Sequence, residues 1–220
     1  MKFLKVENLL TFFNYVFWFF ILNLIFLLFN IPAISFFMFI GISSINTYLP
    51  LFLLSLLPFG PSFTMLLYCT GKILRNKDLN FIEDIKLGFK LNFKQSTIVW
   101  IIELILILIL NINIRFFSKV NFLLVGVFIL LSIILFVITP YIYLLISRFS
   151  LKNLDLLKNS IILAFTRPLI SLGNISCIFF SMVLFELSPG TTFLFMGSIL
   201  AFLINYCNKF LLQELENSIN

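Results

Sequence analysis

Few charged side chains interrupt the apolar stretches of this sequence, and those few could do chemistry. Glu103 lies inside the apolar run 100–105, and Arg148 and Arg167 stand at the ends of two other apolar runs. A charged side chain costs about 2.5–3.5 kcal/mol near the centre of a transmembrane helix, so it should face other helices and find a partner. We therefore predict an ion pair between Glu103 and one of the two arginines. The pair would be an inter-helix clamp or, alternatively, a gate or proton site.

Other reactive side chains are scarce. The chain has no histidine, which removes the commonest general base and metal ligand. Its three cysteines are far apart and none forms a C-x-x-C spacing, so neither a disulfide scaffold nor a cysteine metal site is predicted. No aspartate lies within an apolar run, which argues against an intramembrane aspartyl dyad. We expect no catalysis, no metal and no cofactor.

The composition of the chain indicates whether it is surrounded by water or by membrane lipid. Of 220 residues, 61% are hydrophobic and only 11% are charged, against about 45–50% and about 25% in soluble domains. Too little polar surface exists to cover a water-soluble body of this size. Heavy use of Phe, Ile, Asn and Lys suggests A/T-rich codons and a low-GC bacterium. We expect an integral protein of a bacterial cell membrane in contact with membrane lipids.

Six apolar segments are long enough to cross a membrane, which takes about 20 residues. Their continuous apolar character excludes the alternating pattern of barrel strands. The predicted fold is an all-α, polytopic helical bundle that forms a single membrane domain over 1–220. The six predicted spans are 12–39, 48–74, 96–113, 122–146, 169–185 and 191–212.

Basic residues predict the orientation of these spans. With both termini in the cytoplasm, thirteen of the fifteen lysines and arginines lie on the inner side, including Lys2 and Lys5 before the first span. The positive-inside rule favours this arrangement. Basic residues distributed between apolar runs do not form a phosphate-binding face, so nucleic acid is not an expected partner.

Two amphipathic segments, 80–95 and 152–165, precede predicted inner ends of spans. Asn80 and Glu83 have the spacing of a capping box, which predicts a helix start. Both segments are expected to lie in the membrane interface. They also suggest an internal repeat, with 49–113 and 122–186 as its copies. The first segment carries a candidate cytoplasmic docking face made of Phe81, Ile85, Phe89, Asn92, Phe93 and Lys94.

Prolines interrupt several of the spans. Gly60, Pro61 and Ser62 form a candidate helix-break motif, and Pro140 lies near the end of another span. A proline removes a backbone donor and favours a kink. Such breaks serve helix packing, and in transporters they also form substrate sites.

One stretch resembles the YesL-like family of bacterial membrane proteins, a domain of unknown function. The similarity rests on the 57–62 segment, the basic turn at 72–77, and the run Phe89-x-x-Asn92-Phe93-Lys94-Gln95. The 30–32 segment and residues 148–149 with 158–160 are also similar to the family pattern. The resemblance implies an association with carbohydrate uptake systems, and it implies no catalytic residues.

Three functions follow as expectations. The first is an accessory or regulatory component associated with carbohydrate uptake, with an ABC-type sugar transporter subunit as its partner. The alternative is a small transporter or channel that uses the proline-kinked helices and Glu103. A third reading is a membrane-stress or lipid-interacting protein without transport. A polar cavity reaching Glu103 would favour the transporter, and a closed bundle with a groove on its inner surface would favour the accessory role.

Overall fold

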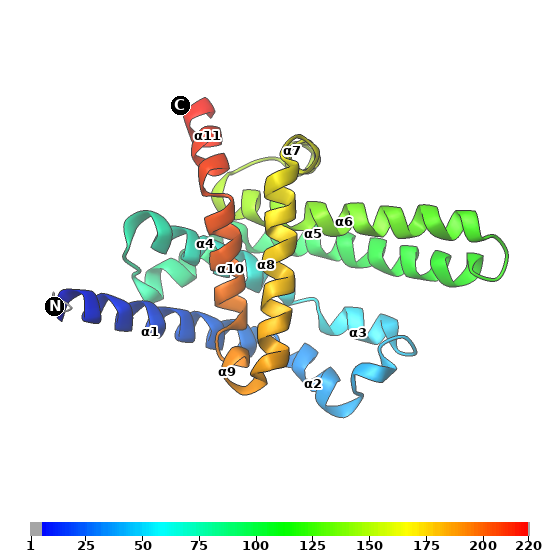
Figure 1. The fold of residues 1–220 in the computed structure, drawn as a ribbon, viewed down its shortest axis with the longest axis horizontal. Coiled ribbons are helices and arrows are strands. Elements are labelled where there is room, and N and C mark those ends of the chain that lie inside the picture. The colour runs from blue at the N-terminus through cyan, green and yellow to red at the C-terminus, as the bar shows by residue number, and fades with distance from the viewer. Residues whose placement is uncertain (1–5, 220) are drawn as a thin grey trace.

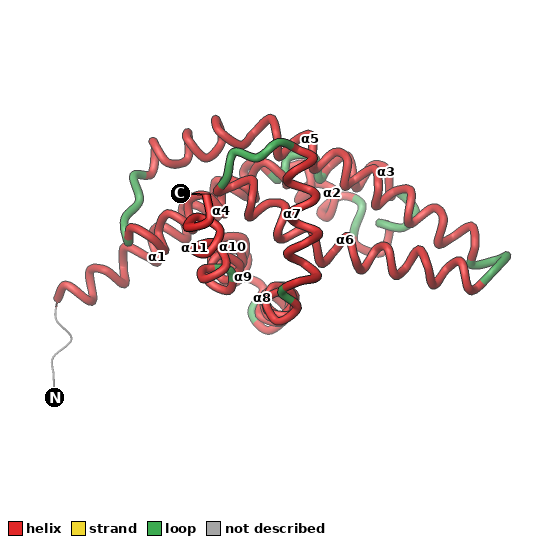
Figure 2. Tube along the Cα trace, turned by 90° about the horizontal axis from the view of Figure 1, so that it is seen from above, coloured by secondary structure: helices red, strands yellow, loops and turns green. Residues whose placement is uncertain are grey.

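The computed structural model describes residues 6–219, with side chains from 11 to 217, so Lys2 and Lys5 lie outside the described residues. The described residues form helices joined by turns, with no strand among them (Figures 1 and 2). The predicted all-α fold is therefore confirmed. The helices are α1 (Val6–Phe29), α2 (Ile31–Phe39), the short 3₁₀ helix η1 (Ile42–Ser44), α3 (Leu49–Ser55), α4 (Phe59–Asn76), α5 (Phe81–Phe117), α6 (Phe122–Arg148), α7 (Asn153–Thr166), α8 (Pro168–Leu187), α9 (Pro189–Phe193), α10 (Met196–Cys207) and α11 (Lys209–Ile219).

Helix α4 is the centre of the fold. It packs against α1, α5, α6 and α10, and nearly every residue from Gly60 to Ile73 is buried. Small residues allow this close packing, because they let neighbouring backbones approach. Hydroxyl groups in α4 bond to the carbonyls one turn earlier, as Thr64 does to Gly60 and Thr70 does to Leu66. These bonds satisfy the polar side chains of a helix that has no access to water.

Five stretches of helix are long and apolar enough to cross a membrane: Thr11–Phe29, Leu49–Asn76, Phe81–Phe117, Phe122–Arg148 and Pro168–Leu187. The sixth predicted span, 191–212, is divided instead among α9, α10 and α11. Its longest piece, α10, has 12 residues, which is about 18 Å of helix against a hydrocarbon core of about 30 Å. The structure therefore supports five spanning helices and one shorter apolar helix.

Two helix breaks lie side by side near the centre of the fold. The first span breaks at Asn30, where α1 ends and α2 begins, and the second breaks at 56–58, between α3 and α4. The amide Nδ2 of Asn30 donates to Ser62 Oγ at 2.9 Å and to the carbonyl of Phe26 at 2.8 Å. The polar groups of the two breaks therefore partly satisfy one another.

Helix α5 differs from its prediction. The amphipathic segment 80–95 and the third span form one continuous helix of 37 residues, about 55 Å long. No proline lies in 81–117, and the helix continues through Gly88 and Asn92, so no break separates an interfacial helix from the span. Helices α5 and α6 form a long hairpin, and in Figure 1 α8 runs roughly perpendicular to it, with α10 packed beside α8 and α4.

The second amphipathic segment forms a separate helix, α7. It ends at Thr166, and α8 begins at Pro168, which restricts the preceding residue to non-helical conformations. The two copies of the predicted repeat therefore differ at this junction, since α5 runs through without a break. The repeat itself stays a prediction.

Candidate functional site

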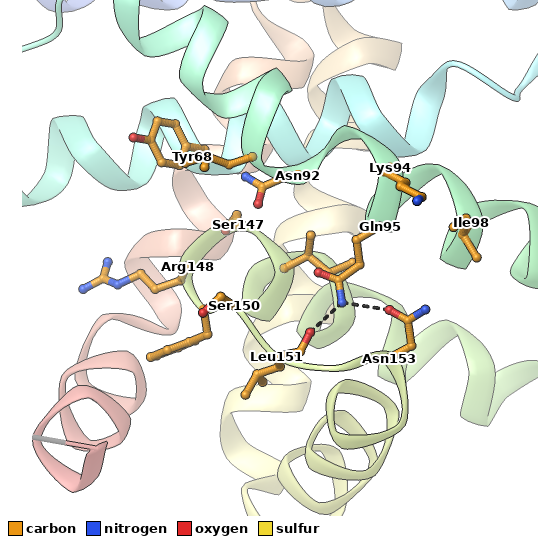
Figure 3. A pocket seen from close by; sticks show the side chains of 13 residues that line it. Tyr68, Asn92, Lys94, Gln95, Ile98, Ser147, Arg148, Ser150, Leu151 and Asn153 are labelled. Carbon is orange, nitrogen blue, oxygen red and sulfur yellow. Dashed lines mark hydrogen bonds between the residues drawn. The ribbon is translucent and has the colours of Figure 1, made fainter.

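A polar pocket lies between α5 and the chain that joins α6 to α7 (Figure 3). Its volume is about 580 Å³. The predicted topology places this connection on the cytoplasmic side. The pocket is lined by Tyr68, Leu91, Asn92, Lys94, Gln95, Ile98, Ile146, Ser147, Arg148, Phe149, Ser150, Leu151 and Asn153; we call it the α5–α6 pocket.

A half-buried ion pair attaches the start of α5, the helix that contributes one wall, to α4. Lys72 Nζ on α4 lies 2.6 Å from Asp84 Oδ1, and Asp84 Oδ2 accepts the backbone N–H of Asn80 at 2.8 Å. The helix thus begins after Asn80, as predicted, but Asp84 and not Glu83 accepts the backbone N–H of this N-cap residue. One carboxylate both caps α5 and attaches it to α4.

Gln95 attaches the opposite wall. Its amide Nε2 donates to the carbonyl of Leu151 at 2.8 Å and to Asn153 Oδ1 at 2.9 Å, as the dashed lines in Figure 3 show. These bonds hold the α6–α7 connection against α5. Polar contacts within the chain therefore connect the two walls of the pocket.

Asn92 is the unusual residue of the pocket. It is only 9% exposed, its side-chain nitrogen Nδ2 is buried, and that nitrogen has no hydrogen-bond partner. In Figure 3 the amide projects from α5 toward the segment that carries Ser147. A buried donor without a partner costs about 1–3 kcal/mol, and no described residue supplies an acceptor for this amide nitrogen.

The predicted docking face is divided between two uses. Phe81 packs edge-on against Phe17 of α1, with ring centroids 5.6 Å apart, and Phe89 lies 4.6 Å from Phe29. Ile85 also packs against the core. Side chains of α1 therefore cover most of the face that the sequence predicted to be available for docking. The predicted members that remain accessible, Phe93 and Lys94, are exposed beside the pocket, and Asn92 lines it.

The helix-break motif has a structural partner. The indole Nε1 of Trp100 donates to the carbonyl of Leu56 at 2.7 Å, at the point where the second span breaks. Gly60 lies directly against this ring, because a Cβ at position 60 would come within 2.5 Å of Trp100 Cβ and Cγ. Ser62 bonds to the carbonyl of Pro58 at 2.7 Å. The motif is buried in the interface between α4 and α5, and Pro61 is buried with it.

The predicted ion pair of Glu103 is wrong. Glu103 is buried, but its carboxylate accepts a hydrogen bond from the Tyr143 hydroxyl at 2.8 Å and a longer one from Thr139 at 3.5 Å. Both residues belong to α6, the other arm of the hairpin. Neutral hydroxyl donors therefore satisfy this carboxyl within the protein.

Both predicted arginine partners instead bond to α11. Arg148 donates from Nε and Nη2 to the two carboxylate oxygens of Glu216 at 2.6 and 2.9 Å, and Arg167 Nη2 lies 2.6 Å from Glu214. The two hydrogen bonds from Arg148 lower the pKa of Glu216 below its ordinary value. These pairs attach the C-terminal helix to the ends of α6 and α8.

Sequence reasoning missed these partners for identifiable reasons. Glu214 and Glu216 lie beyond the last predicted span, where no apolar run indicated a contact. The partners of Glu103 had a signal that was not used. In a hairpin of two antiparallel helices, residues at equal distances along the chain from the connecting loop lie opposite each other. Counted from the loop at 118–121, this rule places Glu103 within about one helical turn of Thr139.

Other features of the interior do not extend this site. An apolar cavity of about 390 Å³ lies between α1, α4, α6, α8 and α10. Glu103 lines neither this cavity nor the α5–α6 pocket. Within the described part of the chain, no group of three or more acidic, cysteine or histidine side chains is arranged to hold a metal ion.

Comparison with known protein families finds a match to the central helices. A search of curated proteins and a search of solved structures each found no match. A family match covers the C-terminal part of α1, all of α2, α3 and α4, and most of α5, so it includes both helix breaks and one wall of the pocket. Residues 19–114, somewhat less than half of the chain, match the family described as "Protein of unknown function, DUF624".

Proposed function

We propose that this chain is an integral membrane accessory or regulatory component that docks a partner protein in the α5–α6 pocket. The partner proposed is a subunit of an ABC-type carbohydrate uptake system at the inner membrane face. The observation that carries the docking proposal is the buried, unpartnered Nδ2 of Asn92 in an open polar pocket. The carbohydrate association rests on the family resemblance alone.

The chemistry of the pocket defines the segment that it would accept. Asn92 requires an acceptor such as a backbone carbonyl or a carboxylate. Lys94 adds a positive charge at the rim, and Phe93 offers an exposed apolar ring, 48% exposed, on the same helix. A short acidic or carbonyl-rich segment followed by an apolar side chain fits this combination.

The site around Glu103 favours this proposal over transport. A transported ion or solute needs a path to the charged group, yet Glu103 is only 3% exposed and lines neither the pocket nor the apolar cavity. Its carboxylate is already bonded to Tyr143 and Thr139. We therefore assign this group to the packing of α5 on α6.

The test replaces Asn92 with leucine, which has a similar size but no amide. Because Nδ2 has no partner among the described residues, Asn92→Leu should leave the fold intact. The matched control is Asn113→Leu on the same helix, whose amide bonds only to Ile109 one turn away. Cells that express tagged wild type, Asn92→Leu, Asn113→Leu or Glu103→Gln are solubilised in mild detergent. Co-purified proteins are then identified by mass spectrometry, and sugar uptake is measured in parallel.

We expect sugar-transporter subunits to co-purify with wild type, Asn113→Leu and Glu103→Gln, and to be lost with Asn92→Leu. Uptake should fall only in the Asn92 variant. Equal recovery of these subunits with wild type and Asn92→Leu would contradict docking at this pocket. Loss of flux in Glu103→Gln with normal co-purification would instead favour the transporter.

A further inference from the structure

A second, smaller cavity lies on the other side of Arg148. It has a volume of about 240 Å³ and is formed where α4 ends, α6 ends and α11 begins. In Figure 3 the guanidinium of Arg148 is turned away from Asn92 and Gln95. The cavity is lined by Gly71, Leu74, Arg75, Arg148, Asn205, Lys209, Leu212 and Gln213; we call it the basic cavity.

Three cations from three different helices line this one cavity. Arg75 comes from α4, Arg148 from α6 and Lys209 from α11. Of these three cations, only Arg148 forms an ion pair with a described side chain, and Glu216 occupies its Nε and Nη2 while leaving Nη1 free of that bond. Arg75 and Lys209 form no ion pair with a described residue. The cavity therefore gathers more positive charge than the chain neutralises.

A glycine lets the side chains of Arg75 and Asn205 approach α4 closely. A Cβ on Gly71 would lie 3.1 Å from Asn205 Oδ1 and 3.4 Å from Arg75 Nη1. The guanidinium therefore folds back over the last turns of α4, next to the amide of Asn205. That amide is held in place, because its Nδ2 donates to the carbonyl of Leu67 and to Thr70 Oγ1, both at 3.0 Å.

We infer that the basic cavity binds a phosphate group, supplied by the headgroup of an anionic phospholipid. Arginine presents paired N–H groups that match phosphate oxygens, and lysine adds a point charge. A volume of about 240 Å³ accommodates a phosphate with ordered water, since one water takes about 30 Å³. The side-chain oxygen of Asn205 can accept a hydrogen bond from a hydroxyl group on the same headgroup.

The position of the cavity indicates a lipid source. Arg75 and Arg148 stand at the ends of two helices that are long and apolar enough to cross a membrane. The ends of such helices lie at the level of the headgroups, where basic pockets between helices bind anionic lipids. A soluble phosphate compound would offer the same group, and the experiment separates the two sources.

The test measures binding to the full-length protein in a neutral detergent. The probes are short-chain phosphatidylglycerol, short-chain phosphatidylcholine and glycerol 3-phosphate, each titrated while the midpoint of thermal unfolding is followed. The double variant Arg75→Gln/Lys209→Gln removes the two unpaired cations. The control Lys86→Gln/Lys90→Gln removes two exposed positive charges from α5, so both variants have the same net charge.

We expect saturable binding of phosphatidylglycerol that exceeds binding of phosphatidylcholine. The cavity variant should bind at least about tenfold more weakly, because it loses two charge-assisted contacts, while the α5 control should bind as wild type does. Binding of glycerol 3-phosphate without the lipid would overturn the lipid source. No saturable binding of any probe, or equal weakening in both double variants, would overturn the site. Unfolding midpoints without ligand establish that each variant is folded.

Discussion

The contact between Gly60 and Trp100 makes a sharp test of the packing of α4 on α5. A methyl group at position 60 would come within 2.5 Å of two Trp100 side-chain atoms, Cβ and Cγ. Favourable carbon–carbon contact begins at about 3.5 Å, so the two helices would have to separate by roughly 1 Å. Trp100 Cβ is attached to the backbone, and no change of rotamer moves it away. Overpacking of this kind costs about 1–3 kcal/mol.

Gly126 provides a matched control for this substitution. It lies in α6, and a Cβ there would meet nothing within 4 Å. Alanine is favoured over glycine inside a helix by about 0.5–1 kcal/mol. The same chemical change should therefore act with opposite sign at the two positions, since Gly60→Ala lowers the free energy of unfolding and Gly126→Ala leaves it equal or raises it.

The free energy of unfolding of each variant is measured in mixed micelles by titration with a denaturing detergent. Tryptophan fluorescence reports the contact directly in the Gly60→Ala variant, because Trp100 is at the site. Equal stability of Gly60→Ala and wild type would refute the packing of α4 on α5 described above. A fall of similar size in Gly126→Ala would show that glycine itself, and not the indole contact, is responsible.

Two further outcomes can be measured with the same titration. Trp100→Phe keeps an aromatic ring but removes the hydrogen bond to the carbonyl of Leu56. It should lower the free energy of unfolding by about 0.5–1.5 kcal/mol, because that carbonyl keeps one backbone partner. An unchanged free energy of unfolding would contradict this hydrogen bond. The pair of Arg148 with Glu216 should stabilise the protein at neutral pH and lose its effect as the pH falls, because the pKa of Glu216 is lowered in the folded state. The stability difference between wild type and Glu216→Gln should therefore be full above the ordinary carboxyl pKa and vanish below the lowered one, and a constant difference across this range would refute the assignment.

Some features of the fold could be predicted from local sequence. The all-helical class follows from long apolar runs, because backbone groups in lipid must bond within their own segment. The starts of α2 and α8 follow from Pro32 and Pro168 near their first positions, since proline is tolerated there and not in the middle of a helix. The break before Gly60 was expected for the same reason.

Tertiary structure decided which polar groups meet. Glu103 needed a partner, but the sequence alone did not show whether that partner would be an arginine or a hydroxyl group. The α5–α6 hairpin places the Tyr143 hydroxyl 2.8 Å from the Glu103 carboxylate. The face that carries Phe89 looked free until α1 covered it. The unpartnered amide of Asn92 is a property of neighbours distant in the chain. By itself the sequence determined which segments are helical and apolar, because that depends on residues within a few turns, whereas the pairing of buried polar groups depends on how those helices cross.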